Sequence, residues 1–275
     1  MKKTAVLITT FNRKETTLRG LEALRKAILH MDKEVYHFDI FLVDDGSKDG
    51  TYESVSTQFP EVHLFKGGGN LYWVHGTQMA WKKAVETDNY DYFLWFNDDN
   101  CLYENALEVL FLSAKDNPDS VICGALCNHN GQPSFCGRDR KGNMCKPNGT
   151  YVEIHRMHGN LVLIPHKVFH AIGMMDTRFR HFFGDFDYGF CVREAGFSIL
   201  LTPSFVGTND NHDDELMNHL KELSFMKRWK MTHNTKHHPK YTFLFHKKHM
   251  GLHVALKVYI THYLYILFPS FLDSK

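Results

Sequence analysis

Short apolar runs alternate with segments of helical hydrophobic spacing along the first hundred residues of the chain. The run "TAVLITT" at 4–10 ends at the polar "FNR", and an apolar stripe with helical spacing follows at 15–30. Three further runs, at 40–43, in "VHLFKGGGN" and in "YFLWFNDD", also end at polar or glycine-rich turns. Nearly continuous apolar strands that alternate with helices predict an α/β protein with a mostly parallel sheet covered on both faces.

Polar groups follow each expected strand at the point where it leaves the core. These are Thr9, Asp44 with Asp45, the glycine loop 67–70 and the turn 97–99. Because ligands bind where the carboxyl ends of parallel strands converge, we expect a ligand site at this edge. Carboxylates beside a glycine loop suit a nucleotide diphosphate with Mg²⁺ or Mn²⁺. A single Asp-Asp turn is more often simply solvated, so the prediction depends on the combination.

Composition and charge narrow the possible classes of protein further. The 275 residues suffice for one large α/β domain or two small ones. Near balance between 32 basic and 31 acidic residues gives no signature of nucleic-acid binding, although 221–275 hold ten Lys or Arg against two acids. The first residues lack the apolar core of a secretory signal. We therefore expect a cytoplasmic protein whose six cysteines are ordinary thiols, not zinc ligands.

Five segments together resemble family 2 glycosyltransferases, the inverting enzymes with the GT-A fold. They are "VLITTFNR", "FLVDDGSKDGT", "GGGNLYWVHGTQMAW", "FLWFNDDN" and "FFGDFDYGFCVREAGFSI", in the family's order and spacing over residues 4–212. Within the family, the chain is most similar to bacterial transferases that build surface polysaccharides. The resemblance implies a Rossmann-like, mostly parallel sheet flanked by helices and followed by a C-terminal helical extension.

The resemblance implies a nucleotide-binding role for the first two motifs. Thr9 and Asp45 would lie against a pyrimidine base, with Asp44 nearby. The chemistry of the residues themselves leaves Asp44 and Asp45 as alternative acceptors for a base imide or a ribose hydroxyl. The donor-binding set implied by the family is completed by Asn12, Gly68 and Asn70.

The "NDD" segment stands where the family has its DxD metal motif. Asp99 would ligate Mn²⁺ or Mg²⁺ directly, and Asp98 would assist near the ribose or the metal. Asn97 replaces the first Asp of the motif, which weakens the bond expected there. His212, in "GTNDNH", matches a late metal ligand of related enzymes.

Asp185 in "GDFD" matches the family's general base, with Gly184 in place of the usual Glu. Inverting transfer needs a carboxylate that takes the acceptor's proton from the face opposite the departing nucleotide. The metal offsets charge on the diphosphate. A structural alternative is that Asp185 caps a helix expected to begin near Asp187.

The expected function is metal-dependent, hexosyltransferase-like transfer from a UDP- or dTDP-sugar to a glycan or lipid-linked acceptor in surface-polysaccharide synthesis. Residues 1–215 form the expected catalytic domain, with 1–120 for the donor and 121–215 for the acceptor. The alternative is a sugar-nucleotide-binding assembly partner without turnover, which Asn97 and Gly184 permit. A nucleotidyltransferase would need a glycine loop directly after the first strand, which "ITTFNRKE" lacks.

The extension, residues 216–275, is basic, aromatic and expected to be helical. Its apolar run at 254–268 is shorter than the roughly 20 residues that span a bilayer. Lysines beside aromatic surface suit peripheral contact through 240–272 with the inner face of the cell membrane. The alternative is that this helix packs on the catalytic domain or, in a homo-oligomer, on a second copy of the chain.

Overall fold

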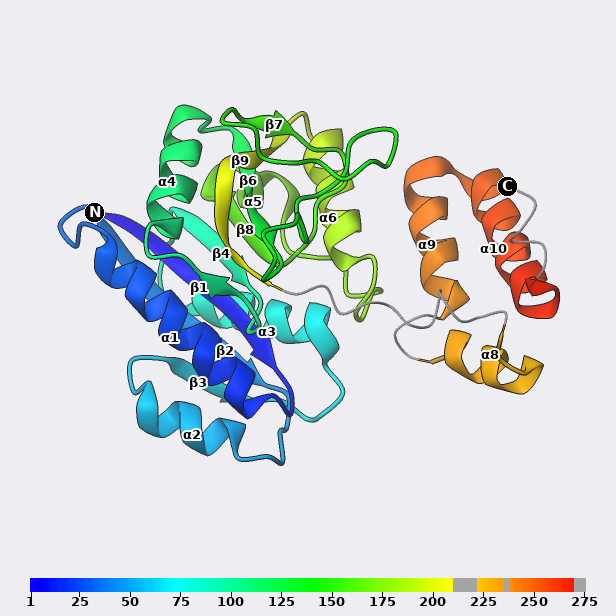
Figure 1. Ribbon diagram of the computed structural model, residues 1–275, viewed down its shortest axis with the longest axis horizontal. Coiled ribbons are helices and arrows are strands. Elements are labelled where there is room, and N and C mark those ends of the chain that lie inside the picture. Colours follow the sequence, from blue (N-terminus) through cyan, green and yellow to red (C-terminus); the bar gives the residue numbers. More distant parts are fainter. Residues whose placement is uncertain (210–221, 235–237, 270–275) are drawn as a thin grey trace.

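A central sheet with helices on both faces forms the larger part of the molecule, and three C-terminal helices lie beside it (Figure 1). The computed structural model describes residues 1–209, 222–234 and 238–269. The helices of the sheet domain are α1 (Lys14–His30), α2 (Thr51–Gln58), α3 (Tyr72–Thr87), α4 (Ala106–Asp116), α5 (His166–Ile172) and α6 (Gly184–Glu194).

Nine strands in the described residues form one mixed sheet, in the order β3-β2-β1-β4-β8-β6-β9-β5, with β7 paired to β9. They are β1 (Lys2–Thr10), β2 (Tyr36–Asp44), β3 (His63–Lys66), β4 (Tyr92–Phe96), β5 (Cys101–Leu102), β6 (Ser120–Cys127), β7 (Val152–Glu153), β8 (Leu161–Pro165) and β9 (Ser198–Thr208). The first four are parallel, as the sequence predicts. Strand β8 runs antiparallel to both of its neighbours, β4 and β6.

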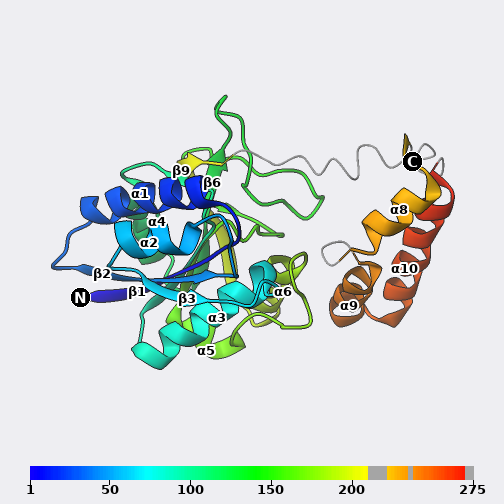
Figure 2. The same cartoon turned by 90° about the horizontal axis from the view of Figure 1, so that it is seen from below.

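The two faces of the sheet bury separate apolar clusters. Helices α1, α2 and α4 cover one face, and α3, α5 and α6 cover the other (Figure 2). The alternation of side chains along β1 explains both clusters, since Val6 and Ile8 enter one and Ala5 and Leu7 the other. Continuous apolar strands are therefore required here, because each strand is buried on both faces.

Residues 124–157 belong partly to a strand and partly to a loop. Strand β6 continues to Cys127 with every residue buried, and the loop begins at Asn128. Pairing with β9 extends the strand, and such pairing cannot be read from local composition. The loop returns to the sheet at β7.

The C-terminal helices are α8 (Phe225–Thr232), α9 (Pro239–Met250) and α10 (Leu252–Leu267). Helix α9 lies nearer to the sheet domain and α10 farther from it in both views (Figures 1 and 2). Phe245 of α9 packs against Phe183 and Phe190, with ring centroids 5.1 and 5.2 Å away. Helix α9 thus packs on the sheet domain, whereas such packing of the helix expected at 254–268 remains a prediction. None of the helices within the described residues has the length and apolar character needed to cross a membrane.

Candidate active site

The carboxyl ends of β1, β2 and β4 meet the beginning of the antiparallel strand β8 at one edge of the sheet. Residue Thr10 is paired with Asp44, and the N–H of Asp45 donates to the carbonyl of Thr10 at 2.9 Å. The N–H of Asn97, directly after β4, donates to the carbonyl of Asn160 at 2.9 Å. The strand-end residues predicted from the sequence are thereby brought together.

Helix α3 passes close over the end of β1. A Cβ on Gly76 would lie 2.1 Å from the Oγ1 atom of half-buried Thr9. Glycine is needed at this position because no side chain fits between the helix and the strand. Thr9, which is predicted to contact the nucleobase, therefore lies under the first turns of α3.

The carboxylate of Asp45 organises the glycine loop. Its Oδ1 accepts the N–H of Gly69 at 2.8 Å, and its Oδ2 accepts those of Leu71 and Tyr72 at 2.8 and 3.1 Å. A Cβ on Gly67 would lie 2.7 Å from Oδ1, whereas Gly68 has open space around it. Both oxygens of Asp45 are thus committed to the loop that also carries Asn70, so the proposed contact of Asp45 with a base remains a prediction.

The carboxylate of Asp44, unlike that of Asp45, has only one of its oxygens in a hydrogen bond. Its Oδ1 accepts the N–H of Ser47 at 2.7 Å, while its buried Oδ2 has no hydrogen-bond partner among the described residues. A buried carboxylate oxygen without a donor is costly, typically by about 1–3 kcal/mol. A donor from a bound nucleotide, such as a base imide or a ribose hydroxyl, fits this position.

Asn12 joins the two strand-end loops. It adopts a left-handed backbone with a φ of 50°, its N–H donates to Ser47 Oγ at 2.8 Å, and its Oδ1 accepts the N–H of Lys48 at 2.7 Å. An Asn tolerates this backbone conformation better than most residues. Asn12 therefore supports the loop that follows Asp44 and Asp45.

Asp98 is a buried, fully engaged carboxylate. It is 3% exposed, and its two oxygens accept from Arg13 Nη1 and Thr17 Oγ1, each at 2.8 Å. Burial raises the pKa of Asp98, and the Arg13 guanidinium partly opposes that rise. Asp98 thus holds the turn in place.

Asp99 lies nearer the surface and shares the same arginine. Arg13 Nη2 is 3.1 Å from its Oδ2, and Asn209 Nδ2 donates to its Oδ1 at 2.8 Å. One hard carboxylate at this edge fits a Mg²⁺ or Mn²⁺ ion that takes its other ligands from phosphate and water. Sequence reasoning missed Arg13 and Asn209, although "FNR" contained the first. The predicted second ligand, His212, lies outside the described residues.

Asn97, which stands in place of the first Asp of the family's metal motif, has a structural role of its own. Its Oδ1 accepts the indole N–H of Trp73 at 2.7 Å. The same indole lies against Gly159, where a Cβ would be 2.5 Å from the ring. Asn97 therefore holds an aromatic ring of α3 against Gly159. Trp81 of the same helix is fully buried in the core.

Asp185 is held across this edge at the start of α6. Its Oδ2 accepts the N–H of Gly159, and its Oδ1 accepts that of Phe186, both at 2.9 Å. Gly159 is followed by Asn160, whose carbonyl receives the N–H of Asn97. A short run of contacts thus joins Asp185 to the "NDD" turn.

Two expectations about α6 are wrong. The helix begins at Gly184 and not near Asp187, because Phe183 turns the chain with a φ of 70°. Asp185 lies in the first turn and Phe183 is the N-cap, so the capping alternative does not describe this helix. Gly184 replaces the family's Glu because a Cβ there would lie 2.3 Å from Val74 Cγ2.

The electrostatics favour a proton acceptor at Asp185. Burial raises the pKa of Asp185, while nearby His158 and the two N–H donors act in the opposite direction. Burial also lowers the pKa of His158, which favours the neutral imidazole. A carboxylate with a raised pKa is a stronger base than an exposed one.

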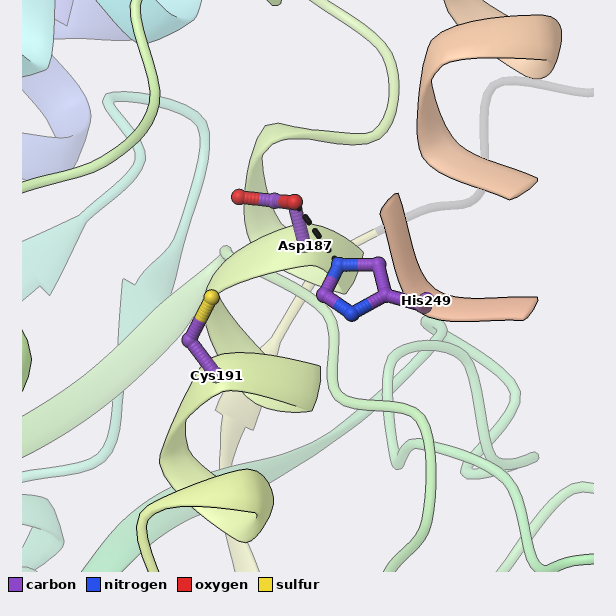
Figure 3. A group of neighbouring side chains, drawn as sticks. All are labelled: Asp187, Cys191 and His249. Carbon is purple, nitrogen blue, oxygen red and sulfur yellow. Dashed lines mark hydrogen bonds and ion pairs between the residues drawn. The ribbon is translucent and has the colours of Figure 1, made fainter. Parts of the chain in front are cut away.

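A second group of potential metal ligands joins α6 to the C-terminal extension (Figure 3). The ligand atoms of Asp187, Cys191 and His249 lie within 4.8 Å of one another, a spacing that a metal ion would require. The ammonium of Lys248 is 2.8 Å from Asp187, and His249 Nε2 is 2.8 Å from the same carboxylate. These two side chains already satisfy Asp187, so the cluster is explained as an ionic contact between helices.

The fold and the strand-end site define a glycosyltransferase of the GT-A class. The model of the family described as "Glycosyl transferase family 2" matches residues 5–185, and the chain belongs to this family. All six cysteines are free thiols.

Several characterised and uncharacterised proteins are similar to this chain. An uncharacterized glycosyltransferase of Rickettsia prowazekii is 27% identical over 172 residues, covering 59% of this chain and 52% of its own. The poly(ribitol-phosphate) β-N-acetylglucosaminyltransferase TarP of Staphylococcus aureus is 27% identical over 129 residues, covering 45% and 36%. The structure of S. aureus TarS with UDP-GlcNAc has a TM-score of 0.63 at 12% identity, covering 100% and 93%. The chain spans about half or less of the curated relatives it matches.

The close approach of α3 to Gly184 predicts an intolerance to any side chain there. Gly184→Ala should lower the free energy of unfolding by about 1–3 kcal/mol, because its Cβ overlaps buried Val74. Gly68→Ala, at a glycine with open surroundings and no positive φ, should stay within about 0.5 kcal/mol of wild type. Equal denaturant midpoints for all three proteins would contradict the steric explanation.

The ionic contact at Asp187 predicts unequal roles for two adjacent lysines. Lys248→Met should cost about 1.5–3 kcal/mol, since it removes a charged hydrogen bond from a buried carboxylate. The change should also reduce the hydrogen-exchange protection of α9. Exposed Lys247→Met serves as the matched control and should leave both quantities unchanged. Identical exchange in the two variants would refute the docking role of Lys248.

Proposed function

We propose that the protein is an inverting, metal-dependent glycosyltransferase that moves a hexose-type sugar from a UDP- or dTDP-sugar to a hydroxyl of a glycan or lipid-linked acceptor in cell-surface polysaccharide synthesis. The observation that carries this proposal is the contact of Asp185 with Gly159, next to the residue that binds the "NDD" turn. This contact supports a general base at Asp185 next to a diphosphate site at the "NDD" turn.

The donor site is proposed at the ends of β1 and β2. The unpaired Oδ2 of Asp44 supports recognition of a base imide or ribose hydroxyl, and Thr9 directly precedes Thr10, the residue paired with Asp44 in the sheet. Gly68 leaves the loop backbone accessible to a ligand. The UDP-GlcNAc complex of TarS supports a uridine diphosphate donor for this chain as well.

Asp99 is the proposed metal ligand, with His212 as a second. When bound, Mn²⁺ or Mg²⁺ offsets the negative charge that grows on the departing diphosphate. Arg13 holds Asp98 and Asp99 in a fixed relation and places a second positive charge beside them. Asp98 fixes the turn from below through Thr17.

Asp185 is the proposed general base. The acceptor oxygen bonds to the anomeric carbon as the bond to the diphosphate oxygen breaks, and the acceptor's proton passes to the Asp185 carboxylate. The N–H groups of Gly159 and Phe186 orient this carboxylate. Single displacement on opposite faces inverts the anomeric centre.

The same division of the chain is proposed: donor binding by 1–120, acceptor binding by 121–215 and an extension at 216–275. Free thiols support a location in the reducing cytoplasm, at the inner face of the membrane. The alternative is a sugar-nucleotide-binding assembly partner without turnover, which the Asn97 and Gly184 departures permit; the contacts of Gly184 with Val74 and of Asn97 with the indole of Trp73 are compatible with both functions.

Metal-dependent donor binding is predicted to require Asp99. Isothermal titration with UDP and with dTDP should show at least tenfold tighter binding in Mn²⁺ than after chelation, because the ion links the diphosphate to the carboxylate. Asp99→Asn should remove this difference, while Glu104→Gln, an exposed acid near the turn, should retain it. Metal-independent binding in wild type would contradict the assignment.

Asp185→Asn is predicted to keep nucleotide binding and lose turnover by about 10²–10⁴-fold, because a proton acceptor is removed. The base works only when deprotonated, and its pKa is raised. In wild type, kcat/KM should therefore fall as pH decreases through a pKa above the ordinary value of about 4. Release of UDP from nucleotide sugars, followed across pH, measures both effects; full turnover by the variant would exclude Asp185 as the base.

A further inference from the structure

Helix α10 presents an exposed apolar face within the described residues. Its other side packs on the neighbouring helices through buried Ala255 and Ile266. Large side chains recur every three or four residues on the exposed face and are 37–57% exposed: Leu252, Leu256, Ile260, Leu264 and Leu267. Residues at this spacing share one face of a helix, so they form a continuous stripe.

The apolar surface continues from α10 onto α8. Arg228 of α8 donates from Nε to the carbonyl of Ile266 at 2.9 Å, and Trp229 packs on Tyr263 with ring centroids 5.9 Å apart. Near this joint, Phe225, Met226 and Trp229 are also exposed. A patch built from two helices is larger than the scattered apolar residues that a soluble surface normally carries.

Basic residues predominate in the described parts of the extension. Helix α10 contains no acidic residue, and Glu222 is the sole carboxylate in the described parts of the extension, 222–234 and 238–269. Exposed basic residues of the same segments are Lys227, Lys230, Lys240, Lys247 and Lys257. Positive charge beside apolar surface is complementary to anionic lipid headgroups.

We propose that the exposed face of α10, with the adjoining residues of α8, lies in the headgroup region of an anionic bilayer, with α10 parallel to the membrane plane. The 16-residue helix is about 24 Å long, which suffices for such contact and not for a crossing. Lys257 fits this position because its aliphatic stem covers apolar surface while its ammonium reaches the phosphates.

A second copy of the chain fits the same face less well. Lys257 and His253 are exposed on the side that bears Leu256 and Ile260. A pairing of two such faces would bring the lysines of both copies toward one apolar contact, where an uncompensated charge is costly. Lipid phosphates supply the compensating charge that a second copy lacks.

The docking of α9 gives this surface a consequence for the reaction. Asp187, two residues beyond Asp185, holds Lys248 of α9, and α9 is followed directly by α10. A membrane-bound α10 therefore fixes the orientation of the helix that carries the base, which suits an acceptor anchored in lipid. This last step depends on the proposed function; the membrane contact does not.

Vesicle flotation of the full chain tests the proposal. Wild-type protein should float with vesicles of phosphatidylcholine and phosphatidylglycerol at 3:1, and at least tenfold less with phosphatidylcholine alone or in high salt. Leu256→Ser/Ile260→Ser and Lys257→Glu should each reduce binding to the anionic vesicles at least tenfold. The matched control is Leu29→Ser/Leu112→Ser, which removes equally exposed apolar residues from α1 and α4 and should bind as wild type.

Light scattering and circular dichroism on the same samples complete the test. All variants should keep the wild-type helical signal, because the changed side chains are exposed. Absence of wild-type flotation, or equal flotation of Leu256→Ser/Ile260→Ser, overturns the proposal. A dimer that this double variant dissociates would show that the face joins two copies instead. Vesicle binding without any release of UDP would contradict the proposed glycosyltransferase activity and leave the proposed membrane contact of α10 intact.

Discussion

The site depends on one segment, residues 158–160, which lies between the two halves of the sheet. Strand β8 is antiparallel to β4, so the residues just before β8 lie beside the turn just after β4. The Asn160 carbonyl accepts from both Asn97 N–H and Asn100 Nδ2, and Gly159 N–H donates to Asp185. Backbone groups thus set the relation between the acidic turn and the base, which makes it insensitive to most side-chain changes.

The carboxylates around this segment differ in role because they differ in partners. Asp45 and Asp98 have both oxygens occupied by donors from the protein, and such groups hold structure. Asp44 keeps one buried oxygen without a donor in the described residues, so a ligand donor can still satisfy it. Both oxygens of Asp185 accept backbone N–H groups, and burial raises the pKa of this carboxyl. Its raised pKa, and not a missing donor, distinguishes Asp185 from the structural carboxylates.

Sequence pattern predicts the parallel half of the fold well because each of its strands is buried on both faces and ends in a turn. It also indicates that Asp99 follows a buried strand and that Asp185 lies near the start of a helix, although the helix begins at Gly184 and not near Asp187. The commitment of Asp45 to the glycine loop, the bond from Trp73 to Asn97, and Arg13 across the two aspartates all depend on tertiary pairing. Contacts between residues 24 to 86 positions apart leave no local periodicity, so a single sequence does not reveal them.

The helices of the extension have two different kinds of apolar face, and this explains why its sequence is both basic and aromatic. Tyr241 and Phe245 of α9 are buried, and Lys248 of the same helix satisfies a buried carboxylate of α6, so α9 behaves as part of the domain. Helix α10 uses α9 as its support and keeps its larger apolar side chains outward. A helix that needed only to stabilise the domain would turn those side chains inward, because each buried one contributes about 1.5–3 kcal/mol. Their outward position is therefore best explained by contact with a surface outside the chain.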